Sequence, residues 1–216
     1  MIVTVNGLTE QTIFQQNGNT FQAEGRDIRI LARYEEPLVV LLGNVLSDEE
    51  CDELIRLAKD RMKRSKIGST REVDAIRTSS GMFFANNEND LIVNIEKRIT
   101  KIMNVPVEHG DGLQILQYLP GQEYKAHTDY FLPTSQAAKN NRISTIVIYL
   151  NNVEQGGETV FPQLKLSVTP QKGTAVYFEY FYEDDNINKL TLHAGAPVIT
   201  GEKWVATQWM RRQKTK

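Results

Sequence analysis

The sequence predicts an α+β protein in which helices pack on a C-terminal, antiparallel, double-layered β-barrel. From Gly112 onward, short β-branched and aromatic runs are separated by Gly, Pro or Asn clusters about every 8–15 residues, which is typical of sandwiches and barrels. Before that point, two segments have apolar residues at helical spacing. A single domain is expected, because domains usually contain about 100–200 residues and this chain has 216.

The first part of the chain is expected to support the barrel. Residues 1–26 are polar and rich in Asn and Gln, which predicts a loosely ordered leader with one short strand at most. The alternating segment 27–37 and the apolar run 38–43 both predict strands. We therefore divide the domain into the leader, a supporting region over 27–112 with strands, helices and a substrate loop, and a core over 113–211.

Two helices are predicted in the supporting region. Ser47 and Glu50 have the spacing of a capping box at a helix start. Apolar residues then recur at helical spacing, so this helix buries one face; they are Cys51, Leu54, Ile55, Ala58 and Met62. Cys51 is accordingly interpreted as a core residue and not as a reactive thiol. A second apolar stripe predicts the other helix, with Leu91, Ile92, Ile95, Ile99 and Ile102.

The segment 64–81 fits neither a helix nor a strand. It is charged and rich in Ser and Thr, and it is too long for a routine connection. Long structureless loops in compact domains are often functional. With Gly68 and Gly81 as hinges, this segment is expected to act as a mobile lid over a substrate.

Charge and composition exclude several classes of protein. The formal net charge of −2 argues against a general nucleic-acid or anionic-membrane binder, which needs a basic excess. No apolar run approaches the roughly 18–20 residues that span a bilayer, and the first residues lack the features of a secretory signal. The single cysteine, Cys51, cannot form an intrachain disulfide. We therefore expect a cytoplasmic protein.

The three histidines of the chain contain a candidate metal site. His127 and Asp129 are two residues apart, a spacing that on a strand puts both side chains on one face. His193 ends another predicted strand. Two histidines and one carboxylate around a common centre form the facial triad that leaves open positions on iron(II). A lone strand histidine is more often structural, and His109, in a loop, is interpreted as a surface residue.

Lys203 gives the metal hypothesis a chemical context. It follows His193 by ten residues and lies on a predicted strand that enters the core. An ordinary exposed barrel lysine is the alternative. A cation opposite a metal would instead hold a dicarboxylate that chelates the metal. Together these residues predict an iron enzyme with an oxo-acid cosubstrate.

Four motifs resemble the 2-oxoglutarate and Fe(II)-dependent prolyl 4-hydroxylase family. They are LQYLPGQEYKAHTDY (116–130), GGETVFP (156–162), HAGAPV (193–198) and GEKW (201–204). With weaker matches upstream, the resemblance covers residues 38–211 and is greatest to the small bacterial, Bacillus-type relatives of the collagen prolyl hydroxylases. It implies a double-stranded β-helix, a jelly-roll or cupin-like barrel.

The resemblance also implies roles for individual residues. His127, Asp129 and His193 would be the Fe(II) ligands. Lys203 would pair with the distal carboxylate of 2-oxoglutarate, helped by the hydroxyls of Thr159 and Tyr118. On the substrate side, the family points to Arg77, Ser79, Tyr124, Arg142 and Trp209.

The reaction implied by the resemblance converts 2-oxoglutarate, O2 and a peptidyl proline into succinate, CO2 and 4-hydroxyproline, with a ferryl species as the oxidant. Ascorbate is the expected reductant. A proline-containing peptide or collagen-like protein is the expected partner. Two alternatives stay open: a non-catalytic barrel that binds Pro-rich peptides, and the same chemistry on a different substrate. A homodimer through the apolar run 38–42 and the extension before it is also an expectation.

Overall fold

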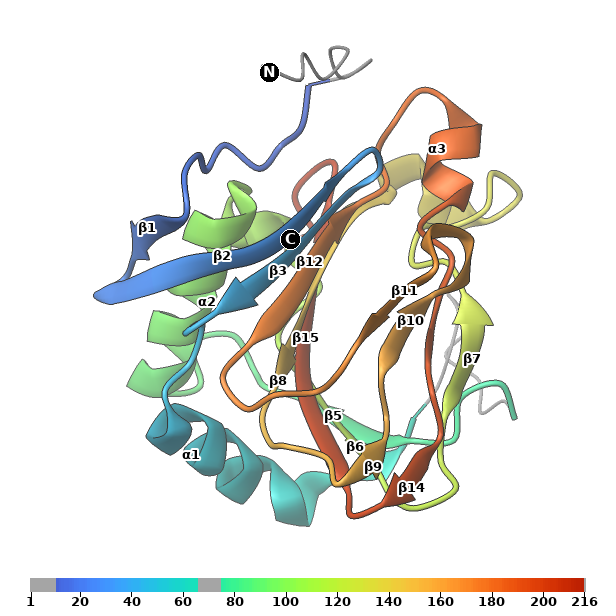
Figure 1. Cartoon of the computed structure of the whole chain (residues 1–216). Helices are drawn as coiled ribbons and strands as arrows, with labels where there is room; N and C mark the ends of the chain where they lie inside the picture. Colours follow the sequence, from blue (N-terminus) through green and yellow to red (C-terminus); the bar gives the residue numbers. More distant parts are fainter. Residues whose placement is uncertain (1–10, 66–74, 216) are drawn as a thin grey trace, which may run out of the picture.

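The computed structural model of the chain describes residues 11–65 and 75–215 (Figure 1). Two β-sheets face each other, and helices cover the outer face of the larger one. All strand pairs are antiparallel. The larger sheet has the order β1 (Thr20–Ala23), β2 (Arg26–Glu35), β3 (Leu38–Gly43), β12 (Ala175–Glu179), β8 (Arg142–Tyr149), β15 (Lys203–Arg211), β6 (Gln114–Tyr118), β5 (Ser80–Phe83), β4 (Lys63–Arg64).

The smaller sheets close the barrel opposite this layer. One has the order β11 (Leu166–Val168), β10 (Thr159–Phe161), β13 (His193–Gly195), β7 (Tyr124–His127), and the other pairs β14 (Val198–Thr200) with β9 (Gln155–Gly156). Strands adjacent in space are mostly not adjacent in the chain, because the chain passes repeatedly between the two layers. The predicted double-layered antiparallel barrel is confirmed, and strands from before residue 113 extend its larger layer.

Strand β15 contributes side chains both to the core under the helices and to the cavity inside the barrel. Nearly all of its residues are buried, and successive side chains point to opposite faces. Trp204, Ala206 and Met210 pack in the core under the helices. The alternate positions face the inside of the barrel and line its cavity; they are Lys203, Val205, Thr207 and Trp209. One strand thus anchors the sheet to the helices and presents polar groups to the cavity.

Two long helices support the sheet. Helix α1 (Asp48–Ala58) begins with the predicted capping box of Ser47 and Glu50, and Cys51 is fully buried. Burial raises the pKa of the Cys51 thiol to about 12, so it stays protonated and unreactive, as expected. Helix α2 (Asp90–Met103) begins at the N-cap Asn89. A shorter helix, α3 (Asp185–Lys189), precedes β13.

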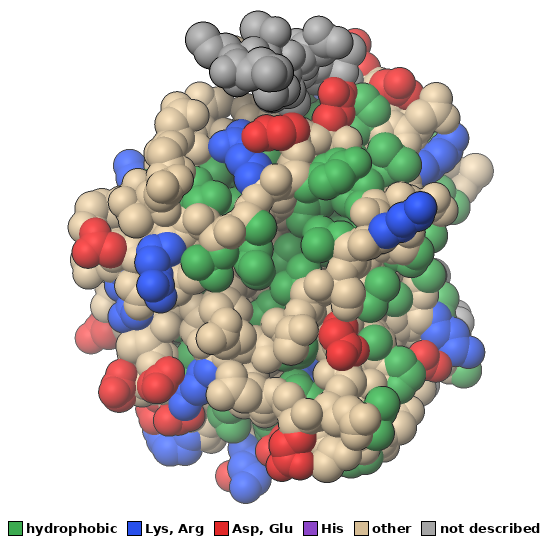
Figure 2. Space-filling model, viewed as in Figure 1, with side chains coloured by type: hydrophobic (Ala, Val, Ile, Leu, Met, Phe, Trp, Pro, Cys, Tyr) green, Lys and Arg blue, Asp and Glu red, His purple; other side chains and the backbone are tan. Residues whose placement is uncertain are grey.

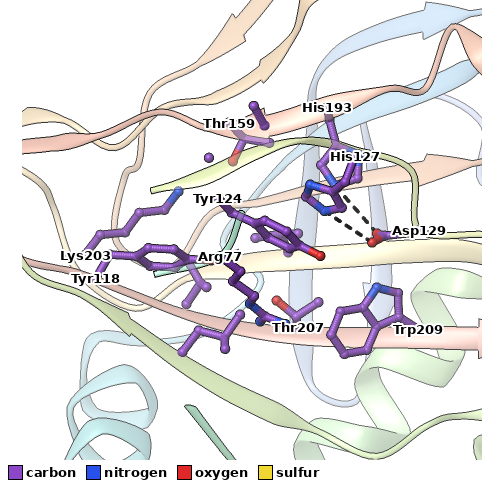
Figure 3. A pocket seen from close by; sticks show the side chains of 15 residues that line it. Arg77, Tyr118, Tyr124, His127, Asp129, Thr159, His193, Lys203, Thr207 and Trp209 are labelled. Atoms are coloured by element: carbon purple, nitrogen blue, oxygen red, sulfur yellow. Dashed lines mark ion pairs between the residues drawn. The ribbon is translucent and has the colours of Figure 1, made fainter. Parts of the chain in front are cut away.

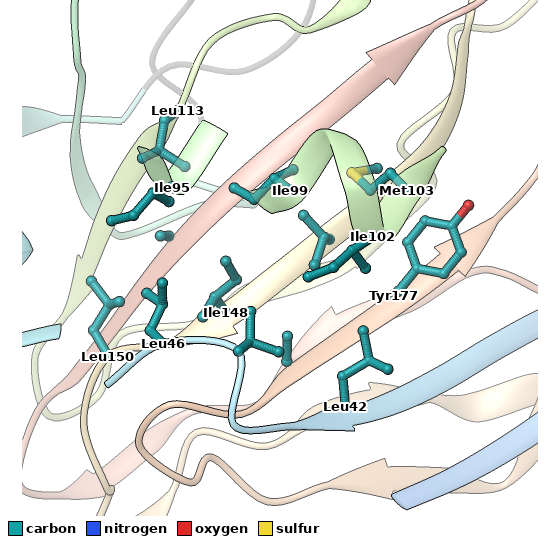
Figure 4. Packing of buried hydrophobic residues seen from close by; sticks show 14 of the residues in the cluster. Leu42, Leu46, Ile95, Ile99, Ile102, Met103, Leu113, Ile148, Leu150 and Tyr177 are labelled. Carbon is teal, nitrogen blue, oxygen red and sulfur yellow. The ribbon is translucent and has the colours of Figure 1, made fainter. Parts of the chain in front are cut away.

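The core between α2 and the larger sheet follows the predicted apolar stripe (Figure 4). Ile95, Ile99 and Ile102 are at most 1% exposed and pack in one cluster with Leu42 and Ile148 of the sheet. Burying one such side chain stabilises the fold by roughly 1.5–3 kcal/mol. Four single 3-10 turns complete the described structure: Lys59–Arg61, Val107–His109, Gln136–Asn140 and Pro162–Leu164.

The N-terminal region differs from the expected loose leader. Residues 1–10 lie outside the described residues, but β1 pairs with β2, and the Phe14 side chain is only 2% exposed. The ring of Phe14 packs on Tyr177 at 5.4 Å, and its backbone N–H donates to the Glu179 carboxylate at 2.8 Å. Residues 11–26 are therefore docked on the larger sheet. The Phe14 N–H supplies a hydrogen-bond donor that the buried Glu179 carboxylate requires.

The apolar run 38–42 is not available for a dimer interface. It lies within β3, which is hydrogen-bonded to β2 on one edge and to β12 on the other. Leu38, Val40 and Leu42 are fully buried. The expectation that this run joins two copies of the chain is therefore wrong, since its apolar side chains are used in the core of a single chain.

The open face of the barrel shows where the remaining apolar residues gather. In Figure 2, hydrophobic side chains line the hollow between the two layers, and most charged side chains lie around its rim. A second core cluster fills the barrel interior and includes Val39, Phe161, Val176 and Phe178. In the described part of the chain, no helix is long and apolar enough to cross a membrane.

Candidate metal centre and cosubstrate pocket

Strand pairing brings the three predicted metal ligands together. His193 opens β13 directly opposite His127, the last residue of β7. Asp129 follows just beyond the end of β7 and not on the strand itself. The Asp129 carboxylate lies 3.6 Å from His127 Nε2 and 3.7 Å from His193 Nε2 (Figure 3). One ligand atom from each residue lies within 4.8 Å of the others.

Backbone carbonyls orient both imidazole rings. His127 Nδ1 lies 2.8 Å from the Lys125 carbonyl oxygen, and His193 Nδ1 lies 3.0 Å from that of Thr191. Because a carbonyl only accepts hydrogen bonds, each Nδ1 must carry the proton. The lone pairs are therefore on the Nε2 atoms, which face the centre. Such hydrogen bonds hold the rings of metal-binding histidines in position.

The carboxylate has its own support from two residues that sequence reasoning missed. The Thr145 hydroxyl donates to Asp129 Oδ2 at 2.7 Å, and it lies 2.7 Å from the Tyr180 hydroxyl. Since Thr145 gives its proton to the carboxylate, Tyr180 donates to Thr145. Thr145 is fully buried and Tyr180 is 2% exposed. The hydrogen bonds from Tyr180 to Thr145 and from Thr145 to Asp129 therefore engage only the Oδ2 oxygen of the carboxylate. The other oxygen, Oδ1, lies nearer to His127.

Electrostatics keep these ligands in the protonation states that a metal needs. Burial by itself would raise the pKa of Asp129, but His193, His127 and Arg142 outweigh it and hold that pKa well below its usual range. Burial, with a contribution from His127, lowers the pKa of His193 to about 4. At neutral pH the site therefore offers a carboxylate and a neutral imidazole, as metal binding requires. Two imidazoles and one carboxylate fit the facial triad of Fe(II) oxygenases.

Lys203 occupies the other end of the same cavity. Its side chain is 4% exposed, and its ammonium lies 5.5 Å from the Tyr118 ring centre and 5.7 Å from that of Tyr149. Among the described residues, no carboxylate forms an ion pair with it. Burial lowers the pKa of Lys203 to about 8, partly opposed by Glu158. A buried ammonium is costly unless it is paired, so this end is suited to an anionic ligand.

Thr159 and Tyr118, the residues predicted to assist Lys203, line the same cavity, and their role stays a prediction. Thr159 is 4% exposed, and its Oγ1 accepts a hydrogen bond of 2.8 Å from the Tyr149 hydroxyl. The Thr159 proton is therefore free to point into the cavity. Tyr118 is 5% exposed and also lines the cavity. The role of Tyr149 was missed, because a tyrosine in a buried strand has the same sequence pattern as any core residue.

The predicted substrate residues lie mainly at the metal end. The Tyr124 ring stacks on the His127 ring, with a centroid separation of 3.4 Å, and the Arg77 guanidinium lies 4.8 Å from the Tyr124 ring centre (Figure 3). The Arg142 guanidinium lies 4.2 Å from the Trp209 ring centre. All four residues line a groove of about 920 Å³ that borders the metal ligands.

Ser79 differs from the expectation. It is fully buried and lies behind Arg77, whose Nε donates to its hydroxyl at 3.2 Å. The Ser79 hydroxyl in turn donates to the hydroxyl of Ser65 at 2.8 Å. It does not line the groove, and its link to the groove is the hydrogen bond from Arg77. Within the predicted lid over 64–81, residues 66–74 lie outside the described residues, and the lid stays a prediction.

His109 lies outside the metal cluster, as expected. It is half-buried, and its Nδ1 lies 3.1 Å from the Arg211 carbonyl oxygen. Among the described residues, the only cluster able to hold a metal is the trio of His127, Asp129 and His193.

Comparisons with known proteins agree with this geometry. Residues 113–211 match the 2OG-Fe(II) oxygenase superfamily. The chain is 38% identical to probable prolyl 4-hydroxylase 10 of Arabidopsis thaliana, over 91% of this chain and 76% of that protein. It is also 38% identical to prolyl 4-hydroxylase 5 of the same plant, over 81% and 68% of the two chains.

A solved structure shows the same fold. The viral collagen prolyl hydroxylase of Paramecium bursaria Chlorella virus 1, in a complex with 2OG, superposes with a TM-score of 0.66 at 33% sequence identity. The superposition covers 82% of this chain and 96% of the viral chain. The chain therefore belongs to the 2OG-Fe(II) oxygenase superfamily, among the prolyl 4-hydroxylases.

Proposed function

We propose that this protein hydroxylates peptidyl proline at carbon 4, with Fe(II), 2-oxoglutarate and O2. The observation that carries the proposal is the position of Lys203. Its buried ammonium, which has no carboxylate partner among the described residues, shares one cavity with the His127–Asp129–His193 trio. A metal site alone would not need such a cation. A dicarboxylate that reaches from the metal to Lys203 accounts for both the metal ligands and the buried ammonium.

The balanced reaction oxidises two carbon centres with one O2. 2-Oxoglutarate loses CO2 and becomes succinate, which receives one oxygen atom, and the proline C–H bond receives the other. Fe(II), held by the trio, would supply the activation of O2 that organic side chains cannot provide. The chain itself binds, orients and excludes water.

Individual residues have distinct tasks in this proposal. Lys203 would hold the distal carboxylate of 2-oxoglutarate through a charge-assisted hydrogen bond, and the Thr159 hydroxyl would donate a second bond. Tyr118 would close that end of the cavity. Thr145 keeps one oxygen of Asp129 occupied and so fixes the rotation of the carboxylate.

The groove residues would position the peptide. Tyr124 and Trp209 offer flat apolar surfaces next to the metal ligands, which suits a proline ring in an extended, Pro-rich segment. Arg77 and Arg142 would donate hydrogen bonds to peptide carbonyl groups. These side chains would also keep water from the reacting centre.

A direct assay tests the proposal. Purified protein is incubated with Fe(II), 2-oxoglutarate, O2 and a panel of Pro-rich peptides, and both succinate release and peptide mass are measured. We expect succinate and one added oxygen per modified proline, located by fragmentation. The His193→Ala variant and peptides with Ala in place of Pro are the controls. Succinate without peptide oxidation would point to another substrate, and no succinate at all would favour a non-catalytic barrel.

Three further expectations belong to this proposal. Ascorbate would restore iron that is oxidised in turnover without peptide, so omitting it should shorten the linear phase of succinate release. A cytoplasmic location is supported by the single, buried Cys51, and cell fractionation tests it. A homodimer would have to use a surface other than β3, and light scattering at several protein concentrations tests it.

A further inference from the structure

We propose that the preferred substrate carries Asp or Glu next to the target proline. This inference rests on the proposed function and specifies the substrate class. It starts from an imbalance of charge in the groove beside the metal ligands. Five cationic side chains line the groove, but only two carboxylates do. The cations are Lys63, Arg64, Arg77, Arg142 and Arg211, and the carboxylates are Asp111 and Asp129.

The imbalance is local to the groove. The whole chain has a formal net charge of −2, so a cationic groove does not follow from its composition. A cleft lined by one sign of charge attracts ligands of the other sign and raises their rate of association. The groove is therefore electrostatically matched to an acidic segment.

The two carboxylates of the groove are already engaged. Asp111 accepts from Arg142 Nε at 2.8 Å and also from Arg211, so one negative charge is shared by two guanidinium groups. Asp129 faces the metal centre with both histidines. Neither carboxylate forms an ion pair with Arg77.

Arg77 gives the inference its most specific support. It is 4% exposed and borders both the groove and the metal cavity. Among the described residues, the acceptors of its hydrogen bonds are neutral: Ser79 Oγ at 3.2 Å and Gln114 Oε1 at 3.4 Å. No carboxylate of the described residues pairs with it. A buried guanidinium is stabilised by a carboxylate that accepts hydrogen bonds from two of its five N–H groups.

Apolar side chains line the same groove as these cations. Tyr130, Phe131 and Leu132 line it, and Phe131 packs against the guanidinium of Arg142 at 5.0 Å. Lys63 and Arg64, on β4, line the groove together with Arg77. A peptide in this groove would therefore meet both apolar side chains and positive charges. The apolar side chains suit proline, and the cations suit a neighbouring acidic residue.

Matched peptides test the preference. Peptides of equal length have one target proline, and Glu, Gln or Lys stands either before or after it. We measure kcat/KM by mass spectrometry at low and at high salt. In the better of the two positions, we expect the Glu peptide to exceed the Gln peptide about tenfold, the effect of one charge-assisted hydrogen bond. The Lys peptide should be poorer than the Gln peptide, and salt should reduce all differences.

Variants locate the source of the preference. Lys63→Glu should reverse the order of the Glu and Lys peptides, whereas Arg77→Gln should bring the Glu peptide down to the rate of the Gln peptide. Lys101→Gln, which removes an exposed cation of α2, is the matched control and should leave the order unchanged.

The failure of this inference differs from the failure of the proposed function. Equal kcat/KM for the Glu, Gln and Lys peptides at low salt would overturn the acidic preference while leaving prolyl hydroxylation in place. It would mean that the arginines bind only backbone carbonyls. If no peptide in the set were hydroxylated, the proposed function would fail, and the preference with it.

Discussion

The two ends of the inner cavity are both buried, but they differ in how their polar groups are satisfied. At the metal end, carbonyls of Lys125 and Thr191 hold the histidines, and Thr145 holds Asp129. At the other end, the Lys203 ammonium is buried with aromatic rings around it and no carboxylate partner among the described residues. The metal end is thus preorganised, whereas the lysine end has a buried charge that an anionic ligand would pair.

This difference means that the two ends should respond differently to substitution. Loss of a group at the metal end should disrupt an existing network and weaken metal binding. Loss of Lys203 should leave the metal end unchanged and weaken only the binding of 2-oxoglutarate. It should also remove the cost to stability of a buried, unpaired ammonium.

Replacement of a metal ligand should have the largest effect. His193→Ala removes one of three protein ligands, so turnover should be abolished and metal affinity should fall by more than about 100-fold, beyond the range expected for supporting residues. Calorimetric titration with Fe(II) or Mn(II) measures the affinity, and circular dichroism checks the fold. Unchanged affinity in the Ala variants of all three ligands would show that the metal, if any, binds elsewhere.

Lys203→Ala should act on the cosubstrate alone. Loss of a buried charge-assisted contact costs about 2–5 kcal/mol when a partner charge is stranded, which is roughly 30-fold or more in affinity for 2-oxoglutarate. Metal affinity should stay within about twofold of the wild type, since Lys203 is not among the groups that hold the ligands. Half-saturation by 2-oxoglutarate at the wild-type concentration would mean that another group holds the distal carboxylate.

Thr145→Val should weaken the metal end without removing a ligand. The variant keeps the shape of the side chain but deprives Asp129 of a donor at 2.7 Å. Metal affinity should fall by about tenfold, in the range measured for such supporting contacts. Thr145→Ser keeps the hydroxyl and should restore the affinity. If both variants bound metal equally well, the hydroxyl would have a packing role only.

Affinity for 2-oxoglutarate should depend on pH through Lys203. Burial lowers the pKa of Lys203 to about 8, so the free enzyme loses this proton as the pH rises through that value. Binding of a dicarboxylate needs the charged form, and the affinity should therefore fall above pH 8, by up to about tenfold per pH unit. Calorimetry from pH 7 to 9.5 tests this, and Lys203→Arg, which stays charged, should have a flatter profile.

Lys203→Met should stabilise the ligand-free protein. It replaces a buried, unpaired charge by an apolar side chain of similar length, a change often worth about 1–4 kcal/mol. Because the folded-state pKa is lowered, the wild type should recover stability as the pH rises from about 8 toward the unfolded value of 10.5. The advantage of the variant in urea unfolding should shrink over that range. A less stable variant at pH 7 would show that the ammonium has an unrecognised partner.

Local patterns in the sequence predicted most of the fold. Alternation and apolar runs gave the strands over 27–43, and the capping box gave the start of α1, since these features depend only on neighbouring residues. Within the predicted leader over 1–26, the one short strand is β1, and residues 11–26 are held more firmly than their polar composition indicates, because a few contacts suffice to dock a polar segment. Its attachment depends on the Phe14 ring and on Glu179, which is 165 residues away.

The candidate site was also predictable only in part. The residue types and their spacing, His127 and Asp129 two apart and Lys203 ten residues after His193, were readable in the sequence because metal and carboxylate chemistry restricts which side chains can serve. The partners of these groups were not readable. Thr145 is a buried residue of β8, and Tyr180 is a buried residue directly after β12. Nothing in their local pattern distinguishes them from packing residues.

The types and order of a few polar residues on or next to buried strands thus indicate which chemistry the chain can perform. How those residues are held depends on the folded barrel: Tyr180 donates to Thr145, Asp111 joins Arg142 to Arg211, and Ser79 lies behind Arg77. Strand periodicity fixes only the face to which a side chain points. Its partner across the barrel is set by the register and packing of strands far apart in the chain.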